Sequence, residues 1–546
     1  MNSLNRVRIS QLSLALAVAL SATPVLAQNT SSAIGGQVTG VEGKPLAGAT
    51  VTIKHIESGS VNTAVTDANG RYSSRGLRVG GPYTITISKD GLTETKNNVY
   101  LQLAETKSID AALSDKKVLD TVTVTGVAGG SDVFSADKMG AGTNISREQI
   151  DSFASIQRNL QDYARLDPRL SQTDKERGEI SVGGQNSRFN TITIDAVATN
   201  DTFGLESNNL PTIKQPISID AIESVQINIT NYDVTQKAYT GANINAVTKS
   251  GTNEFHGSLY YVYRDDSMAG DRYLRSSDSY IAPPEFSEDT IGFTFGGPIV
   301  KDRLFFFAAY EELESTRGGP VTGPIGSDRF TVAVTPDEVA AAQDIASGTW
   351  DIDIGNSDAD GRAVSVKDSL IKLDANINDS HRASLRWSKT VQSEPLYPSN
   401  FNTPGYATSL SSHWYAQDKT IETWVGQIFS DWTENFSTEL KASYRDYSSA
   451  PNNNTDLPQI RLNFSGALPP GVTTSSQSTS AGLLFGTERS RHFNDLATET
   501  WNFYAGANWF LGDHELKFGV DYDDNSVYNA FLQDTRGNYT FDCINS

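Results

Sequence analysis

Residues 369–390 read SLIKLDANINDSHRASLRWSKT, with apolar and polar side chains alternating on both sides of a short turn. Successive side chains of a β-strand point to opposite faces, so this run predicts a hairpin with one apolar and one polar face. The apolar face would carry Ile371, Leu373, Ala375, Ile377, Ala383, Leu385 and Trp387. The polar face would carry Lys372, Asp374, Asn376, Asn378, Arg382, Ser384, Arg386 and Ser388.

One such hairpin also fits a soluble sandwich, but the same alternation recurs at 501–509 and 516–523 around the turn Gly512-Asp513. Strands of about 10 residues, tight turns at one end, long loops at the other and aromatic residues near the strand ends are typical of transmembrane β-barrels. The repetition therefore favours a barrel in an outer membrane.

The N-terminus has the pattern of a secretory signal peptide over residues 1–27. Arg6 and Arg8 precede an apolar run, and small residues end at Ala27, which makes Gln28 the expected first mature residue. No later segment approaches the roughly 18 consecutive apolar residues of a membrane-spanning helix. An exported chain with alternating strands fits a closed barrel, which satisfies every backbone polar group in lipid.

Charge and cysteine content exclude other classes. The chain has 546 residues and a formal net charge of −21, which argues against a nucleic-acid partner. Its one cysteine, Cys543, rules out an internal disulfide framework and leaves either a buried thiol or half of a bridge.

Residues 33–113 contain short β-rich runs separated by Gly, Pro and Asn, which predicts a β-sandwich. The run Asp67-Ala68-Asn69-Gly70 predicts a turn, because Asn and Gly tolerate positive φ. Metal binding by this run is a remote alternative. These phrases resemble the carboxypeptidase regulatory-like module, a transthyretin-type sandwich that is similar to sugar-binding folds and is not a peptidase.

A connector follows the sandwich and contains an extended, β-branched run at 118–126. A strand there has no sheet of its own, so its edge is suited to pairing with a partner's sheet. The run resembles the TonB box of TonB-dependent outer-membrane transporters, and the resemblance implies contact with a TonB-type energy-transducing protein. The implied contact residues are Leu119, Asp120, Thr121, Val122, Thr123, Val124, Thr125 and Gly126.

Residues 130–251 suggest a mixed α/β unit that resembles the plug domain of the same transporters. A helix is expected to start at Ser146 and another to run from Ile156 to Leu166. Strands are expected at 179–184, 190–195, 222–227 and 242–248. The family favours Asp-Gly where this chain has Asp195-Ala196, a local departure.

The barrel is expected over 253–546, with about nine or ten strand candidates against the 22 of plugged transporters. The order of the units along the chain is sandwich, TonB box, plug and barrel. This order, together with the run Gly296-Gly297-Pro298, resembles Oar-type TonB-dependent receptors. The expected fold class is mainly β: a transthyretin-like sandwich, an α/β plug and an antiparallel transmembrane β-barrel that is incomplete at its C-terminal end. A half barrel has two open edges, so residues 1–546 alone are expected not to insert stably.

Signals for catalysis or metal binding fail on inspection. Residues 356–361 imitate the start of a calcium loop, but its twelfth position is Lys367 rather than Glu. The Gly-rich stretches lack the Lys and Ser/Thr of a phosphate loop, and the six histidines show no zinc-protease pairing. We therefore expect no catalytic residue, no metal, no cofactor and no enzyme activity.

The resemblance implies a receptor in the Gram-negative outer membrane that binds an extracellular ligand and passes it to the periplasm. Alternatives are an adhesion or protein-export receptor on the same barrel, and a soluble secreted β protein. Iron chelates are the common cargo of the superfamily, whereas the sandwich tilts the expectation toward glycans. Recognition is expected in the long loops rather than in the sandwich, where candidate aromatic contacts are Tyr273, Tyr280, Trp350, Tyr397, Tyr406, Trp414 and Tyr415.

Overall fold

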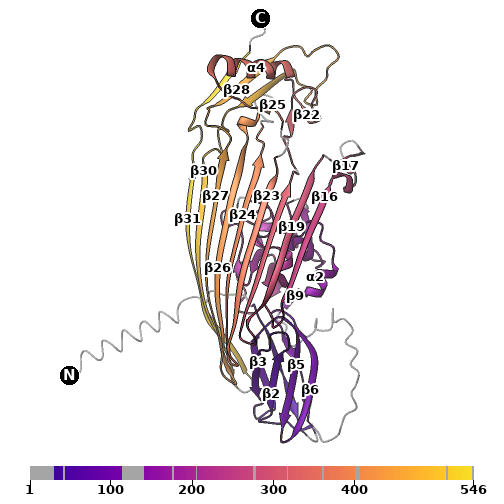
Figure 1. The fold of residues 1–546 in the computed structure, drawn as a ribbon, viewed down its shortest axis with the longest axis vertical. Helices are drawn as coiled ribbons and strands as arrows, with labels where there is room; N and C mark the ends of the chain where they lie inside the picture. Colours follow the sequence, from indigo (N-terminus) through magenta and orange to yellow (C-terminus); the bar gives the residue numbers. More distant parts are fainter. Residues whose placement is uncertain are drawn as a thin grey trace, which may run out of the picture.

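The computed structural model describes residues 30–40, 43–113, 140–174, 177–204, 206–274, 278–283, 285–316, 318–358, 362–399, 406–511 and 514–543. A small sandwich lies below a tall, curved sheet, and a mixed α/β unit lies against the inner face of that sheet (Figure 1). The architecture confirms the predicted mainly-β fold class. No helix in the described ranges has the length and apolarity needed to cross a membrane.

The N-terminal unit, called the sandwich below, is built from two sheets with the orders β4-β1-β7, with β8 also paired to β1, and β3-β2-β5-β6. Ile34, Val51, Ile53, Ile85 and Ile87 are fully buried between them. The strands are β1 (Ser32–Thr39), β2 (Thr50–His55), β3 (Val61–Val65), β4 (Arg71–Leu77), β5 (Gly80–Lys89), β6 (Leu92–Leu101), β7 (Thr106–Ser108) and β8 (Ala111–Ala112).

The segment between β3 and β4 is a turn, as its sequence predicts. The carboxylate of Asp67 accepts hydrogen bonds from the backbone N–H groups of Asn69 and Arg71 at 2.9 and 2.8 Å. Gly70 has φ +71°, and a Cβ there would meet the carbonyl oxygen of Val38 at 2.4 Å. The local hydrogen bonds account for the acidic residue without a metal ion.

The α/β unit, called the plug below, contains a five-stranded sheet of order β13-β12-β15-β14-β9 and a separate β10-β11 hairpin. Its elements are β9 (Gly140–Ile145), α2 (Arg147–Ser152), α3 (Leu160–Ala164), β10 (Leu170–Asp174), β11 (Glu179–Val182), η3 (Ser187–Phe189), β12 (Thr191–Ile194), β13 (Val197–Ala198), η4 (Ile219–Ala221), β14 (Ile222–Asn231) and β15 (Asn243–Thr248). The four predicted strands are present as β11, β12, β14 and β15.

The first predicted helix begins where expected, because Ser146 and Gln149 form a reciprocal capping box at the start of α2. The second prediction, a helix from Ile156 to Leu166, is wrong over its first turn. Arg158 has φ +51°, and the side chain of Asn159 accepts the backbone N–H of Asp162 at 2.8 Å. The helix is therefore capped at Asn159 and spans only α3.

The Asp195-Ala196 pair, which stands where the family favours Asp-Gly, lies in the turn between β12 and β13. Both residues have positive φ, 47° and 59°. This left-handed conformation costs a residue with a Cβ about 1–2 kcal/mol, which explains why Asp-Gly suits the position. Ala196 is also buried.

We expect Ala196→Gly to stabilise the β12–β13 hairpin by about 1 kcal/mol, because glycine adopts positive φ without strain. Hydrogen exchange of the β12 amides, measured by mass spectrometry on the membrane-embedded protein, should slow by about fivefold. Ala196→Val is the matched comparison and should accelerate exchange. Equal protection in the glycine and valine variants would contradict the strain argument.

The large sheet, called the barrel sheet below, is antiparallel with the order β16-β19-β20-β23-β24-β26-β27-β30-β31. Its nine strands agree with the predicted number of candidates. They are β16 (His256–Asp265), β19 (Ser287–Val300), β20 (Leu304–Ser315), β23 (Val364–Asn378), β24 (His381–Leu396), β26 (Tyr415–Thr433), β27 (Phe436–Asn453), β30 (Asn494–Leu511) and β31 (His514–Phe531).

The two faces of the barrel sheet have the predicted chemistry. Ile371 and Leu385 point outward and are exposed, whereas Lys372 and Arg386, one position along each strand, are buried. Leu259, Tyr261, Phe293, Phe295, Trp501, Phe503, Phe518 and Val520 also lie on the exposed outer face. The expected strand length of about 10 residues was wrong, because β26 has 19 residues and β30 has 18. Pairing continues into polar residues such as Lys419 opposite Ser449, which extends the strands past the apolar band.

The connections are asymmetric, as predicted. β23 and β24 join through Asp379-Ser380, and this end of the sheet lies next to the sandwich (Figure 1). The turn predicted at Gly512-Asp513 lies outside the described residues, between paired Leu511 and His514.

At the opposite end, several loops assemble into one compact unit, called the loop cap below. It contains α4 (Pro336–Trp350) and a sheet of order β25-β29-β28-β32 (Figure 1). The strands of this sheet are β25 (Tyr406–Ser409), β28 (Gln459–Ser465), β29 (Ser480–Phe485) and β32 (Asn538–Asp542). The other short elements between the barrel strands are η5 (Asp266–Met268), β17 (Arg272–Leu274), β18 (Ser279–Ile281), β21 (Thr322–Gly323), β22 (Phe330–Thr331) and η6 (Ser411–His413). The loop cap has an apolar core of its own, in which Val332, Val334, Leu410 and Leu483 are fully buried.

Candidate functional site: the polar seam between plug and barrel

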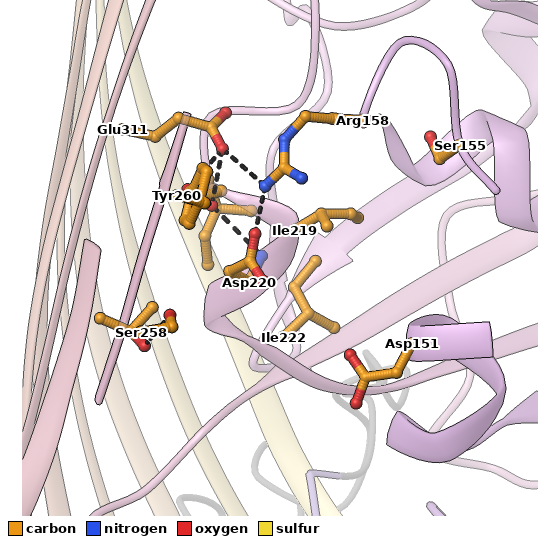
Figure 2. A network of polar contacts seen from close by, with 12 residues as sticks. Asp151, Ser155, Arg158, Ile219, Asp220, Ile222, Ser258, Tyr260 and Glu311 are labelled. Atoms are coloured by element: carbon orange, nitrogen blue, oxygen red, sulfur yellow. Dashed lines mark hydrogen bonds and ion pairs between the residues drawn. The ribbon is translucent and has the colours of Figure 1, made fainter. Parts of the chain in front are cut away.

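The inner face of the barrel sheet holds the plug mainly through charged side chains, and we call this contact the seam. Its centre is Glu311 on β20, whose side chain has no exposed surface. Figure 2 shows Glu311 facing Tyr260 of β16 and Arg158 of the plug, with Asp220 on the other side of the arginine. The barrel therefore supplies a buried anion at the point where the plug supplies two cations, Lys214 and Arg158.

Four groups satisfy the carboxylate of Glu311. Lys214 Nζ donates at 2.6 Å, Tyr260 Oη at 2.7 Å, Ser218 Oγ at 2.9 Å and one Arg158 nitrogen at 3.1 Å. Lys214, Ser218 and Arg158 belong to the plug, so three of the four contacts cross the seam. A buried carboxylate is tolerated only when it is paired and hydrogen-bonded in this way.

Arg158 lies between two anions. It pairs with Glu311 and with Asp220, and its guanidinium lies 4.4 Å from the centroid of the Tyr260 ring. Burial alone would lower the pKa of Arg158, but Glu311 and Asp220 together raise it above its usual value. The cation is therefore fixed in its charged form between plug and barrel.

A second centre lies at the Asp195 turn. Arg386 of β24 donates to the Asp195 carboxylate at 3.0 Å, and the backbone N–H and hydroxyl of Thr248 each donate to it at 2.8 Å. Burial would raise the pKa of Asp195, but Lys372 and Arg386 outweigh it and lower the pKa below its usual value. Lys372 Nζ also donates to the carbonyl oxygen of Thr248 at 3.2 Å.

Other barrel cations follow the same plan. Lys441 donates to the carbonyl oxygen of Ala196 at 2.8 Å, and Arg445 to that of Ala198 at 2.7 Å. The remaining ion pairs across the seam include Lys419 with Glu206, Lys517 with Asp233, and Lys237 of the plug with Asp521. Among the described barrel residues, Phe307, Ala309 and Leu370 belong to the same buried apolar cluster as the plug core.

This chemistry suits a plug that is held firmly and can still be released. Water can replace hydrogen bonds and ion pairs once the groups separate, so the net free energy of each contact is far smaller than its strength in isolation. Within the described ranges, no cluster of three or more His, Cys, Asp or Glu side chains is arranged to hold a metal ion.

The alternation at 369–390 predicts that Lys372 and Arg386 face inward, and both are buried, whereas Glu311 is not among the residues predicted from the sequence. A usable signal was present, since Phe305, Phe307, Ala309 and Glu311 alternate with outward residues, and all four are buried. Period 2 alone would have placed this carboxylate on the inner face. Its cationic partners, Lys214 and Arg158, lie about 100 and 150 positions earlier in the chain, and no local sequence pattern marks them as partners.

The predicted ligand contacts fall into two groups. Tyr273 and Tyr280 form a ring pair with centroids 5.3 Å apart, and they and Trp350 are exposed. Trp414 and Tyr415 are buried; Tyr397 packs edge-on against Trp414 at 5.1 Å, and Tyr406 packs against Phe330 at 5.4 Å. These four rings build the loop region, and the exposed three stay predicted ligand contacts.

The predicted partner strand, Leu119–Gly126, lies outside the described residues, as does the predicted signal peptide. The contact with a TonB-type protein therefore stays a prediction from the sequence.

Comparisons with known proteins agree with this architecture. A family model described as outer membrane beta barrel domain matches residues 247–330 and 353–545, and one described as carboxypeptidase regulatory-like domain matches residues 33–114. The TonB-dependent transporter Oar of Myxococcus xanthus is 29% identical over 294 residues, which cover 52% of this chain and 26% of Oar. The chain thus spans about a quarter of that curated relative, and the match confirms the predicted resemblance to Oar-type receptors.

Among solved structures, the outer membrane transporter YddB from Escherichia coli superposes with a TM-score of 0.51 at 12% sequence identity. The superposition covers 73% of this chain and 50% of YddB. At this identity the similarity concerns the fold alone.

Proposed function

Because this chain belongs to the outer membrane beta barrel domain family, we propose that it is part of a TonB-dependent receptor that imports an extracellular ligand into the periplasm. The protein lies in the outer membrane of a Gram-negative bacterium. In this proposal the loop cap and neighbouring loops capture the ligand. A TonB-type protein then supplies the energy that rearranges the plug.

The seam is the observation that carries the proposal. A plug intended as a permanent wall would be expected to share a continuous apolar core with the barrel, as the two layers of a stable domain do. Here the barrel adds Phe307, Ala309 and Leu370 to the apolar cluster of the plug, and Glu311, Arg386 and Lys441 hold the plug through polar contacts that water can replace. Energy applied to the plug from the periplasm could therefore separate the surfaces without exposing a large apolar area.

Ligand capture is proposed at the outer end of the barrel, where the β17–β18 hairpin presents Tyr273 and Tyr280. Their side chains are 53% and 71% exposed, so each keeps an open ring face. Tyr273 is also oriented by a 2.6 Å hydrogen bond from its hydroxyl to Asp278. Rigid aromatic faces of this kind suit stacking on a sugar ring or an aromatic iron chelator.

We expect the double variant Tyr273→Ala/Tyr280→Ala to weaken ligand binding on intact cells by about tenfold, because each ring face contributes about 0.5–1.5 kcal/mol. Tyr100→Ala removes an equally exposed tyrosine from the sandwich and should leave surface binding unchanged. A stronger effect of Tyr100→Ala would move recognition to the sandwich.

The proposed function is tested by comparing a strain that lacks the protein with its parent on a panel of ferric chelates and oligosaccharides as sole iron or carbon source. Import predicts loss of growth on at least one solute, and the same loss when the TonB-type partner is deleted. Surface binding of that solute should survive deletion of the partner. Unchanged growth on the whole panel, together with lost cell–cell adhesion or protein secretion, would favour the adhesion or export alternative.

A further inference from the structure

The sandwich lies across the periplasmic end of the barrel sheet and touches its rim (Figure 1). Arg75 pairs with Glu515 of β31, and Asn62 donates to Asp431 of β26 at 3.4 Å. The backbone N–H of Asn253 donates to the carbonyl oxygen of Glu57 at 2.7 Å. The sandwich is therefore attached at several separate points of the rim.

The same unit also touches the plug from below. Gln226 of β14 donates to the carbonyl oxygen of Leu103 at 2.9 Å, and Asn144 of β9 donates to Glu105 at 2.6 Å. Arg78 donates to the carbonyl oxygen of Gly251, where the plug continues into the barrel, at 3.1 Å. The sandwich thus bridges plug and rim.

These contacts are almost entirely polar, and the apolar clusters of sandwich and plug share no described residue. Each unit buries its own core, so separating them exposes little apolar surface. Arg75 and Arg78 of the sandwich add ring contacts to the barrel sheet, with guanidiniums 5.3 and 5.2 Å from the centroids of Phe510 and Phe305. The interface resembles a reversible contact between domains rather than a continuous core.

Two cavities of about 120 and 160 Å³ lie where sandwich, plug and barrel meet. The smaller one is lined by charged or polar groups of all three units: His55, Glu57, Arg78, Glu223, Lys372 and Arg382. Polar cavities of this size hold water, which keeps the contacts around them solvated. Sandwich residues form part of the lining of both cavities, His55, Glu57 and Arg78 in the smaller one and Arg75 and Glu105 in the larger one.

We propose that the sandwich is a releasable stopper that closes the periplasmic mouth of the barrel in series with the plug. A solute leaving the plug region on this side meets the sandwich next. Its docking contacts, Arg75–Glu515 and Asn62–Asp431 foremost, hold the closed state, and their loss opens both cavities to the periplasm. The direction and trigger of release rest on the proposed transport function, whereas the closure itself does not.

The test measures access to the smaller cavity in cells that make the full-length protein, with Cys543 and any other cysteine replaced by serine. Ser384→Cys places a thiol in that cavity, whose wall includes Ser384. Thr63→Cys places one on an exposed position of the sandwich and serves as the accessible reference. The probe is fluorescein maleimide, which enters the periplasm through porins and is too large for the closed cavity.

In cells treated with a protonophore, the thiol at position 384 should react at least about tenfold more slowly than the thiol at position 63. Adding Arg75→Ala and Asn62→Ala should raise its rate by about tenfold, since a partly exposed ion pair and a hydrogen bond are lost. Lys96→Ala removes a sandwich cation away from the interface and should change nothing. Equal reaction of positions 384 and 63 with docking intact, or continued protection after docking is weakened, would overturn the stopper.

Restoring the proton-motive force should accelerate labelling at position 384 in the protein with intact docking. If the docking variant opens the cavity and restored energy has no effect, the stopper stands and energy-driven transport fails. The two proposals therefore fail on different measurements.

Discussion

Replacing Glu311 by alanine is expected to loosen the plug by about 3–5 kcal/mol, because Lys214 and Arg158 are left buried without their shared anion. Cells that produce the Glu311→Ala protein should become at least tenfold more sensitive to vancomycin, a hydrophilic antibiotic too large for ordinary porins. Glu311→Gln retains hydrogen-bonding atoms but loses the charge, and we expect an intermediate sensitivity.

Glu312 provides a matched control on the same strand. Its side chain points to the other face of β20 and pairs with Lys367, whose side chain is 50% exposed. An ion pair in that setting contributes about 0–1 kcal/mol, so Glu312→Ala should leave vancomycin sensitivity unchanged. Equal sensitivity of the Glu311→Ala and Glu312→Ala strains would show that the Glu311 network does not hold the plug.

The second large effect is expected from proline at Val122 or Val124. An added strand is held by its backbone hydrogen bonds, and proline removes the N–H donor and fixes φ. Uptake of the solute identified by growth should fall to background, while surface binding and the amount of protein in the membrane stay normal.

Val122→Thr and Val124→Thr keep the backbone donor and the branched shape, so uptake in these controls should remain near normal. Unchanged uptake in both proline variants would remove residues 119–126 from the contact with the TonB-type partner. Loss of surface binding in the same variants would instead indicate that the substitution disturbs folding of the barrel.

Local patterns predicted much of this fold. The period-2 alternation at 369–390 placed Ile371 outward and Arg386 inward correctly, because strand geometry leaves no other choice once one face is apolar. The Asp67–Gly70 turn and the capping box at Ser146 were readable for the same reason: their hydrogen bonds involve residues within four positions. The resemblance to TonB-dependent transporters predicted the order of sandwich, plug and barrel along the chain.

What the sequence did not reveal depends on distant partners. Glu311 is recognisable as an inward carboxylate, but its pairing with Lys214 and Arg158 exists only once plug and barrel are assembled. The loop cap shows the same limit: Val332, Leu410 and Leu483 come from three separate loops and meet in one core. Trp414 is predicted from the sequence as a ligand contact, but the assembled loops bury its side chain.

The central claim, that the plug must move against the barrel during transport, is tested most directly by a reversible bridge across the seam. Ser218 and Tyr260 face each other with hydroxyl oxygens 3.0 Å apart, so cysteines at both positions can be joined by a short bifunctional methanethiosulfonate. Uptake of the identified solute should stop when the bridge is complete, return after reduction, and stay unaffected by the reagent in each single-cysteine protein. Full uptake with the bridge intact would contradict the account.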